Sequence, residues 1–273
     1  MKTIARSEIT ERLSRLITQC LTTPDAAVTA ALESLKSADT LEATAAALIA
    51  ENNRIAERDG LYCCQDTGQA VFMVKLGDEV YCRGLNAAIN DAVVKAYATA
   101  RKSVADPITR INTGDNSPAV IETELVSGDT LEITFLAKGA GSENMSRLYM
   151  LTPADGRRGI VDSVVDAVSR GGRNACPPLI VGVGIGGVTE TACMLSKRAL
   201  IRPLGEHSSR ADVAAIEAEI LEKVNALGIG VAALGGNTTA LAVNIETAPT
   251  HIGMLPVAVN LQCHSLRHGT VIF

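Results

Sequence analysis

Several features are missing from this sequence of 273 residues, and each absence excludes a class of protein. It has no Trp, and aromatic residues make up only 3%, so the core has to be built from aliphatic side chains. The formal net charge of −5 leaves no basic excess, which argues against nucleic acid as a partner. The longest uncharged apolar stretch, from Pro177 to Val188, is too short to span a bilayer. The first residues carry charges where a signal peptide needs an apolar core, so we expect a cytoplasmic protein with no membrane partner.

The composition that is present, with 47% hydrophobic and 20% charged residues, is that of a globular chain. Residues 1–58 show helical spacing of apolar positions, with a second helix expected from Pro24 through Lys36. Strands and helices then alternate without a linker or a repeat. We expect a mixed α/β (α+β) fold, with 1–58 as a helical N-terminal region, followed by a compact mixed-sheet unit, and 1–273 as a single domain. The later elements include a helix over 85–101, a hairpin of 119–126 with 130–136, and a buried strand over 179–183.

A Gly-x-Gly-x-x-Gly pattern at Gly182, Gly184 and Gly187 follows that strand and precedes a predicted helix. This is the local context of a dinucleotide-binding fold. However, the helix ends in Leu-Ile-Arg-Pro, where the next parallel strand should begin. We therefore treat a nucleotide-binding oxidoreductase as a minor alternative.

The seven cysteines divide into two groups. Cys20, Cys82 and Cys193 fall within or beside regular elements and are expected to be small buried hydrophobic residues. The others lie in predicted loops beside Gly, Pro, Asn or Asp, at positions 63, 64, 176 and 263. Their spacing is far too long for a zinc finger. Three widely separated thiolates could ligate three irons of a [4Fe–4S] cube and leave the fourth iron open as a Lewis acid.

Four segments, in this order, carry a resemblance to a known family: Cys-Gln-Asp-Thr-Gly (64–68), Lys-Gly-Ala-Gly-Ser-Glu-Asn (138–144), Cys-Pro-Pro (176–178) with the glycines of 182–187, and residues 234–239. From about residue 40 to the C-terminus the chain resembles the class I fumarase family. More narrowly, it resembles the α subunits of two-subunit fumarases and of L-tartrate dehydratase.

The resemblance implies an oxygen-sensitive [4Fe–4S] cluster held by Cys64, Cys176 and Cys263. Cys64 is chosen over Cys63 because the family pattern places the ligand directly before Gln-Asp-Thr-Gly. It also implies substrate-binding roles for Gln65, Arg101 and Gly141, and catalytic roles for Asp66 and His251. The implied reaction is the reversible dehydration of malate to fumarate, in which donors facing the developing anionic carboxylate matter most.

Each of these residues also has a structural interpretation. Asp66 before Thr-Gly is a natural turn residue. His251 could be a hydrogen-bonded loop histidine, and Arg101, at the end of a predicted helix, could complement the helix dipole.

Single-chain family members continue into a second domain that supplies further substrate-binding residues. The resemblance therefore implies that a separate β subunit completes the site, in an αβ or α2β2 assembly acting on a small dicarboxylate. Two alternatives stay open: an α subunit of L-tartrate dehydratase, and a non-catalytic zinc scaffold on the three cysteines and His264.

Overall fold

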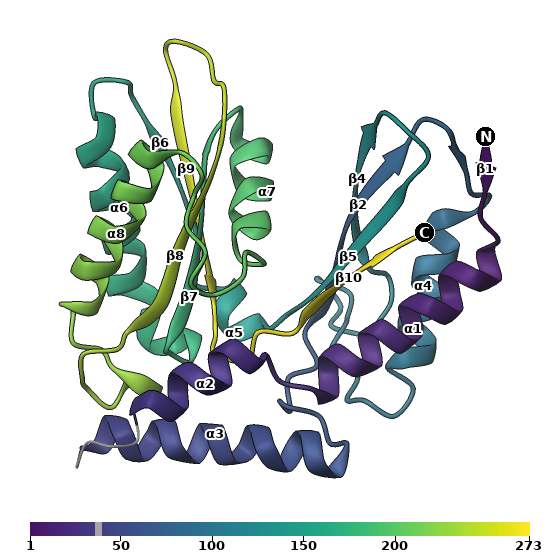
Figure 1. Cartoon of the computed structure of the whole chain (residues 1–273), viewed down its shortest axis with the longest axis horizontal. Helices are drawn as coiled ribbons and strands as arrows, with labels where there is room; N and C mark the ends of the chain where they lie inside the picture. Colours follow the sequence, from purple (N-terminus) through teal and green to yellow (C-terminus); the bar gives the residue numbers. More distant parts are fainter. Residues whose placement is uncertain (36–39) are drawn as a thin grey trace. The chain divides into compact units, whose positions relative to one another are not determined.

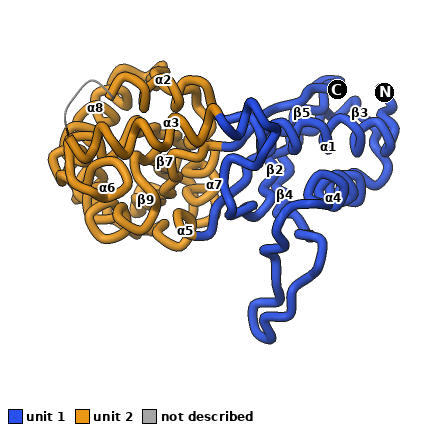
Figure 2. Tube along the Cα trace, turned by 90° about the horizontal axis from the view of Figure 1, so that it is seen from below, with its two compact units in different colours: residues 1–24, 55–140, 267–273 blue, residues 25–54, 141–266 orange. Residues whose placement is uncertain are grey.

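The computed structural model describes residues 1–35 and 40–273, and the chain divides into two compact units (Figures 1 and 2). Unit 1 comprises Met1–Pro24, Ile55–Ala140 and Arg267–Phe273, and unit 2 comprises Asp25–Arg54 and Gly141–Leu266. The mixed α/β class predicted from the sequence is confirmed. Residues 1–58 are mainly helical as expected, but they are shared between the two units. The single domain over 1–273 stays a prediction.

Unit 1 is built on a four-stranded sheet in the order β10-β5-β2-β4. β2 occupies the interior of this sheet, antiparallel to β5 and parallel to β4, and β10 pairs antiparallel with β5. Helices α1 and α4 pack against one another beside the sheet (Figure 1). The elements are β1 (Lys2–Thr3), α1 (Arg6–Thr22), β2 (Gln69–Gly77), β3 (Val80–Tyr81), α4 (Leu85–Ala96), β4 (Val120–Val126), β5 (Leu131–Lys138) and β10 (His268–Ile272).

The core of unit 1 follows from the periodicity of its elements. α1 buries Ile9, Leu13 and Ile17, whose spacing places them on one face of a helix. They join a cluster that includes Phe72 and Phe135, whose ring centroids lie 5.4 Å apart across the β2–β5 pair. Aliphatic side chains supply most of the rest, as the scarcity of aromatic residues requires.

Unit 2 is a three-layer arrangement around a sheet in the order β6-β9-β7-β8. β7 and β8 are parallel, whereas β9 runs antiparallel to both β6 and β7. Helices α6 and α8 lie on one side of this sheet and α7 on the other (Figure 1). The elements are α5 (Ala140–Glu143), β6 (Arg147–Leu151), α6 (Gly156–Gly171), the 3₁₀ turn η2 (Gly172–Ala175), β7 (Leu179–Gly186), α7 (Thr189–Ala199), α8 (Ala211–Asn225), η3 (Val231–Ala233), β8 (Ala240–Ala248) and β9 (Leu255–Gln262).

Two further helices, α2 (Ala26–Ser34) and most of α3 (Leu41–Asp59), belong to unit 2. The predicted role of Pro24 in the first turn of α2 is wrong. Asp25 is the N-cap, because its carboxylate accepts a hydrogen bond from the Val28 amide at 2.9 Å. The predicted end of this helix at Lys36 lies outside the described residues.

Two predictions for unit 1 are corrected. The segments 119–126 and 130–136 do form strands β4 and β5, but they do not form a hairpin, because β2 lies between them. β4 is largely exposed and takes the edge, whereas the buried β2 takes the interior position. The helix predicted over 85–101 ends at Ala96.

Over the described residues, no helix is long and apolar enough to cross a membrane.

Candidate active site

The Cys64 loop of unit 1 connects α3 to β2 and is fastened at both ends. The amide of Cys63 donates to the Leu21 carbonyl at 2.9 Å, and the Asp66 Oδ1 atom accepts from the Gly68 amide at 2.9 Å. Cys63 is buried, and burial raises the pKa of its thiol to about 11. Cys64 is only half-buried, so it is the cysteine of this pair with more access to a ligand.

Asp66 ties this loop to Ala140 and Arg267, which lie at two of the four points where the chain crosses between the units. Its Oδ2 atom accepts from the amide of Ala140, the last residue before the chain passes to unit 2, at 2.9 Å. Its carbonyl accepts from Nη1 of Arg267, the first residue after the chain returns, at 2.7 Å. Both carboxylate oxygens of Asp66 therefore accept backbone hydrogen bonds. This geometry matches the turn interpretation and also gives Asp66 a positioning function.

The two predicted substrate-binding side chains of unit 1 are both accessible. Gln65 is exposed, and its side chain makes no hydrogen bond within the described part of the chain. Arg101 is also exposed and lies at the start of the long connection between α4 and β4 that extends from unit 1 in Figure 2. Its carbonyl accepts from the Thr67 hydroxyl at 3.0 Å, so its backbone is held beside the Asp66 loop. Because α4 ends five residues earlier, Arg101 does not complement its dipole.

In unit 2, Cys176 is exposed and holds an unusual backbone conformation. It follows η2 and precedes β7, with φ 54° and ψ 68° in the left-handed region. This conformation costs a residue with a Cβ atom about 1–2 kcal/mol. A non-glycine residue persists there when its surroundings fix it, and such outliers are frequent at functional sites.

Cys263 lies at the same end of the unit 2 sheet as Cys176. It directly follows β9, and the amide of His264 donates to the Cys176 carbonyl at 3.4 Å. The Gln262 side-chain amide donates to the Cys263 sulfur at 3.5 Å. The Oε1 atom of Gln262 and the hydroxyl of Ser265 are buried and have no hydrogen-bond partner within the described residues. The structure therefore brings the Cys176 and Cys263 segments together, with unsatisfied polar groups beside them.

Gly141 belongs to this same end of unit 2. It lies in α5, and a Cβ atom built on it would be 3.5 Å from the Asn174 carbonyl oxygen, two residues before Cys176. Glu143 of α5 forms an ion pair with Lys197 and accepts a hydrogen bond from Asn260 at 3.1 Å. These contacts hold α5 against α7 and β9.

The structure does not bring His251 to these residues. It lies in the connection between β8 and β9, at the opposite end of β9 from Cys263. It is exposed, and its Nδ1 atom accepts from the Gly253 amide at 3.1 Å. This contact fits the interpretation of a hydrogen-bonded loop histidine.

The predicted ligands are thus divided, with Cys64 in unit 1 and the other two cysteines in unit 2. Over the residues described, no group of three His, Cys, Asp or Glu side chains is placed to hold a metal ion. The residues nonetheless fit an iron–sulfur cluster in their chemistry: thiols in loops, a strained exposed Cys176, and buried polar atoms beside Cys263 that have no partner.

Comparison with known proteins identifies the family of this chain. The sequence model of the "Fumarate hydratase (Fumerase)" family matches residues 10–272. The chain belongs to the fumarate hydratase family. It is 42% identical over 231 residues, 81% of each chain, to the "Putative L(+)-tartrate dehydratase subunit alpha" of Methanocaldococcus jannaschii. It is 36% identical over 218 residues to the L(+)-tartrate dehydratase subunit alpha of Escherichia coli (strain K12), covering 77% of this chain and 71% of that protein. The prediction of a hydro-lyase is confirmed.

Two glycines of the 182–187 segment allow α7 to pack closely against β7. A Cβ atom on Gly182 would lie 2.1 Å from the Ser196 carbonyl oxygen, and one on Gly184 would lie 2.0 Å from that of Ala192. Both glycines therefore allow α7 to approach β7 at backbone distance. The neighbouring Cys193 is exposed on α7, so its predicted burial is wrong, whereas Cys20 is buried as expected.

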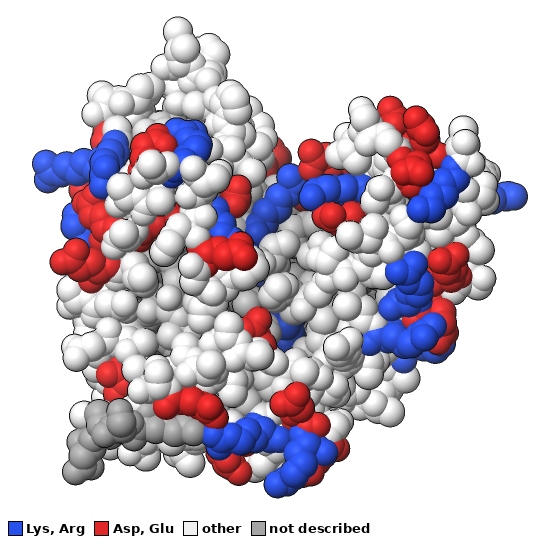
Figure 3. All heavy atoms as spheres, viewed as in Figure 1, with Lys and Arg blue, Asp and Glu red and all other residues white. Residues whose placement is uncertain are grey.

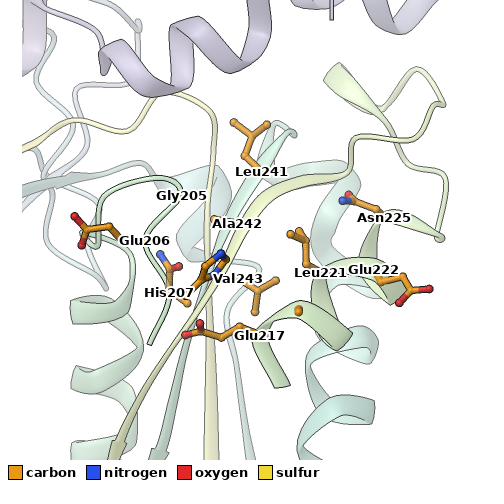
Figure 4. Close-up of a pocket in the computed structure, with 12 residues that line it drawn as sticks. Gly205, Glu206, His207, Glu217, Leu221, Glu222, Asn225, Leu241, Ala242 and Val243 are labelled. Atoms are coloured by element: carbon orange, nitrogen blue, oxygen red, sulfur yellow. The ribbon is translucent and has the colours of Figure 1, made fainter. Parts of the chain in front are cut away.

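A cavity of about 380 Å³ lies elsewhere in unit 2, along the free edge of β8 (Figure 4). Figure 4 shows Glu217 of α8 and His207 of the preceding loop beside Val243 of β8. Glu217 accepts from Arg202 at 2.5 Å and from the Ile245 amide at 2.8 Å. The Glu217 carboxylate therefore takes the place of a neighbouring strand for one backbone amide at the free edge of β8. No predicted site residue lines this cavity.

On the face drawn in Figure 3, Lys and Arg side chains are interspersed with Asp and Glu. That face has no continuous basic patch of the kind that follows a nucleic acid backbone.

Sequence reasoning missed Arg267, which holds the Asp66 carbonyl. Its position within Ser-Leu-Arg-His gives no local signal, and only its burial in the structure distinguishes it.

Proposed function

We propose that this chain is the α subunit of a [4Fe–4S]-dependent hydro-lyase that interconverts malate and fumarate, with Cys64, Cys176 and Cys263 as the cluster ligands. One observation carries the proposal: within each unit, hydrogen bonds fasten the segments that carry the predicted ligands. In unit 1, Asp66 bonds Ala140 and Arg267, which flank two of the four crossings. In unit 2, the Cys176 and Cys263 segments are joined by the backbone hydrogen bond from His264 to the Cys176 carbonyl.

When bound, the cluster would supply a Lewis-acidic iron that stabilises the departing hydroxide. The chain's own residues bind and orient the substrate. Gln65 and Arg101 have accessible side chains that form no hydrogen bond within the described residues and donate to substrate carboxylates, and Arg101 also stabilises the negative charge that develops after proton loss. Asp66 fixes the Cys64 loop to the backbone that leads into Gly141, whose amide is a further donor.

His251 of the same copy is separated from Cys263 by the whole length of β9, eight residues or about 23 Å. In the proposed α2β2 assembly, His251 therefore acts in the site of the second α subunit. Coexpression of a His251→Ala chain with a Cys64→Ser chain tests this assignment. Mixed assemblies should recover activity that neither variant has alone, and absence of recovery would remove His251 from the site.

The substrate is a small 2-hydroxy dicarboxylate, with malate preferred because the Gly-Ser-Glu-Asn-Met segment (141–145) resembles that of fumarase α subunits. L-Tartrate is the second candidate, because the relatives at 36–42% identity carry the tartrate dehydratase name. Comparing fumarate formation from malate with oxaloacetate formation from tartrate decides between them.

A β subunit completes the site, as the names of those relatives support, and the assembly is cytoplasmic. Coexpression with the β subunit should give at least a hundredfold more turnover than the α chain alone after anaerobic reconstitution. Comparable turnover by the isolated α chain would contradict the need for a partner.

The cluster itself is tested by iron and sulfide analysis after oxygen-free isolation. The wild-type chain should be brown, and Ser variants of the three ligands should lose iron, whereas Cys193→Ser on exposed α7 should retain it. A colourless chain with one zinc ion would instead support the zinc scaffold and overturn the proposal.

A further inference from the structure

Arg267 is a buried cation that has no anionic partner among the described residues. It is the largest of the fully buried side chains and only 2% exposed. Its Nη1 atom donates to the Asp66 carbonyl at 2.7 Å, but its Nε atom is buried and has no hydrogen-bond partner. Within residues 1–35 and 40–273, Arg267 forms no ion pair.

This arrangement is unfavourable unless another group completes it. A guanidinium cannot release its proton at any ordinary pH, so burial cannot be relieved by neutralisation. An uncompensated buried charge costs several kcal/mol, and buried charges in proteins are normally paired. The contact at Nη1 shows where an anion would lie, because the Asp66 carbonyl that accepts from Arg267 at 2.7 Å belongs to the loop of Cys64, the proposed ligand two residues earlier.

We infer that Arg267 is the positioning residue and counter-charge of the Cys64 loop, compensating the negative charge of a thiolate-ligated iron–sulfur cluster. The inference rests on the proposed function. Three thiolates make such a cluster anionic, and charge and hydrogen bonds around a cluster control its stability and reduction potential. Through its bond to the Asp66 carbonyl, the same guanidinium fixes the loop that presents Cys64.

The test compares Arg267→Lys, which keeps the charge, with Arg267→Gln, which keeps a donor but removes the charge. The full-length α chain is reconstituted anaerobically with iron and sulfide. The readouts are bound iron and sulfide, and the rate at which absorbance near 400 nm decays in air. We expect Arg267→Gln to bind iron about 10–100-fold more weakly and to lose its absorbance faster, while Arg267→Lys stays within a few-fold of wild type.

Arg202→Gln is the matched control, because Arg202 is also mostly buried but is paired with Glu217 and Glu246. In the metal-free chain, Arg202→Gln should lower the unfolding midpoint without weakening iron binding. Arg267→Gln should leave the metal-free midpoint unchanged or raise it, because it removes an uncompensated charge.

Equal iron retention by wild type and Arg267→Gln would overturn the inference while leaving the proposed function intact. So would a metal-free midpoint lowered as much as in Arg202→Gln, which would indicate a purely structural role. If Arg267→Gln kept its iron content but had a raised KM, the anion that pairs with Arg267 would be a substrate carboxylate, and the inference would also be overturned. Failure of the wild-type chain to bind iron would instead refute the proposed function.

Discussion

The left-handed backbone at Cys176 leads to a counterintuitive prediction for stability. In the metal-free protein, Cys176→Gly should be more stable than Cys176→Ser, although both variants lose the thiolate. At φ 54° and ψ 68°, a residue with a Cβ atom pays about 1–2 kcal/mol that glycine does not. Glycine also increases the freedom of the unfolded chain, which offsets about 0.4–1 kcal/mol of this gain. The net difference of about 1 kcal/mol corresponds to about 2–4 °C in the unfolding midpoint.

Thermal unfolding followed by circular dichroism in the presence of a chelator measures this difference. The same pair of substitutions at Cys193, inside exposed α7, should show the opposite order, because glycine weakens a helix interior. Iron assays should show that both Cys176 variants have lost the cluster. If Cys176→Ser proved as stable as Cys176→Gly, backbone strain at this position would be refuted.

Three further predictions concern unit 2. Glu217→Ala leaves Arg202 without one of its partners and two backbone amides without an acceptor. Urea unfolding should therefore show that the free energy of unfolding falls by about 3–5 kcal/mol. A fall of less than about 1 kcal/mol would contradict the role of Glu217 as their shared acceptor. Gly184→Ala forces α7 away from β7 and should cost about 1–3 kcal/mol in the same assay, whereas an unchanged midpoint would disprove the close approach. The hydrogen bond from Arg170 holds the pKa of Asp166 below its ordinary value of 3.8. The stabilisation that ionised Asp166 gives the fold is therefore present above pH 3.8 and is lost as the pH falls through the lower pKa of the folded state. The melting difference between wild type and Asp166→Asn should therefore shrink below about pH 4, and a difference independent of pH would contradict the assignment.

The sequence predicted those parts of the fold that local pattern determines. The buried run at 179–183 is part of β7, and residues 1–58 are mainly helical as expected. The prediction that 119–126 and 130–136 form a hairpin was wrong, because strand order depends on which strand buries both of its faces. The more apolar β2 takes the interior position between them. The helix predicted over 85–101 was too long, because the residues that follow Ala96 form turns.

For the candidate site, residue chemistry and loop position selected Cys64, Cys176 and Cys263, because thiols beside Gly and Pro are recognisable in a sequence. Their division between two units could not be predicted, since the chain crosses four times between segments that are distant in sequence. Arg267 was missed for a related reason: arginine is ordinarily exposed, and only tertiary packing buries this one.

Several unfavourable features of this molecule lie beside the proposed ligands. Cys176 holds a left-handed backbone, Arg267 is a buried cation without an anion, and the buried Gln262 Oε1 and Ser265 Oγ atoms beside Cys263 accept or donate no hydrogen bond within the described residues. Each feature costs stability in the metal-free chain, and none is explained by packing of the two cores. By contrast, Glu217, an equally buried charge away from the site, has all its partners. A bound group would compensate for the cost of these features, as expected of a site whose energetics require its ligand.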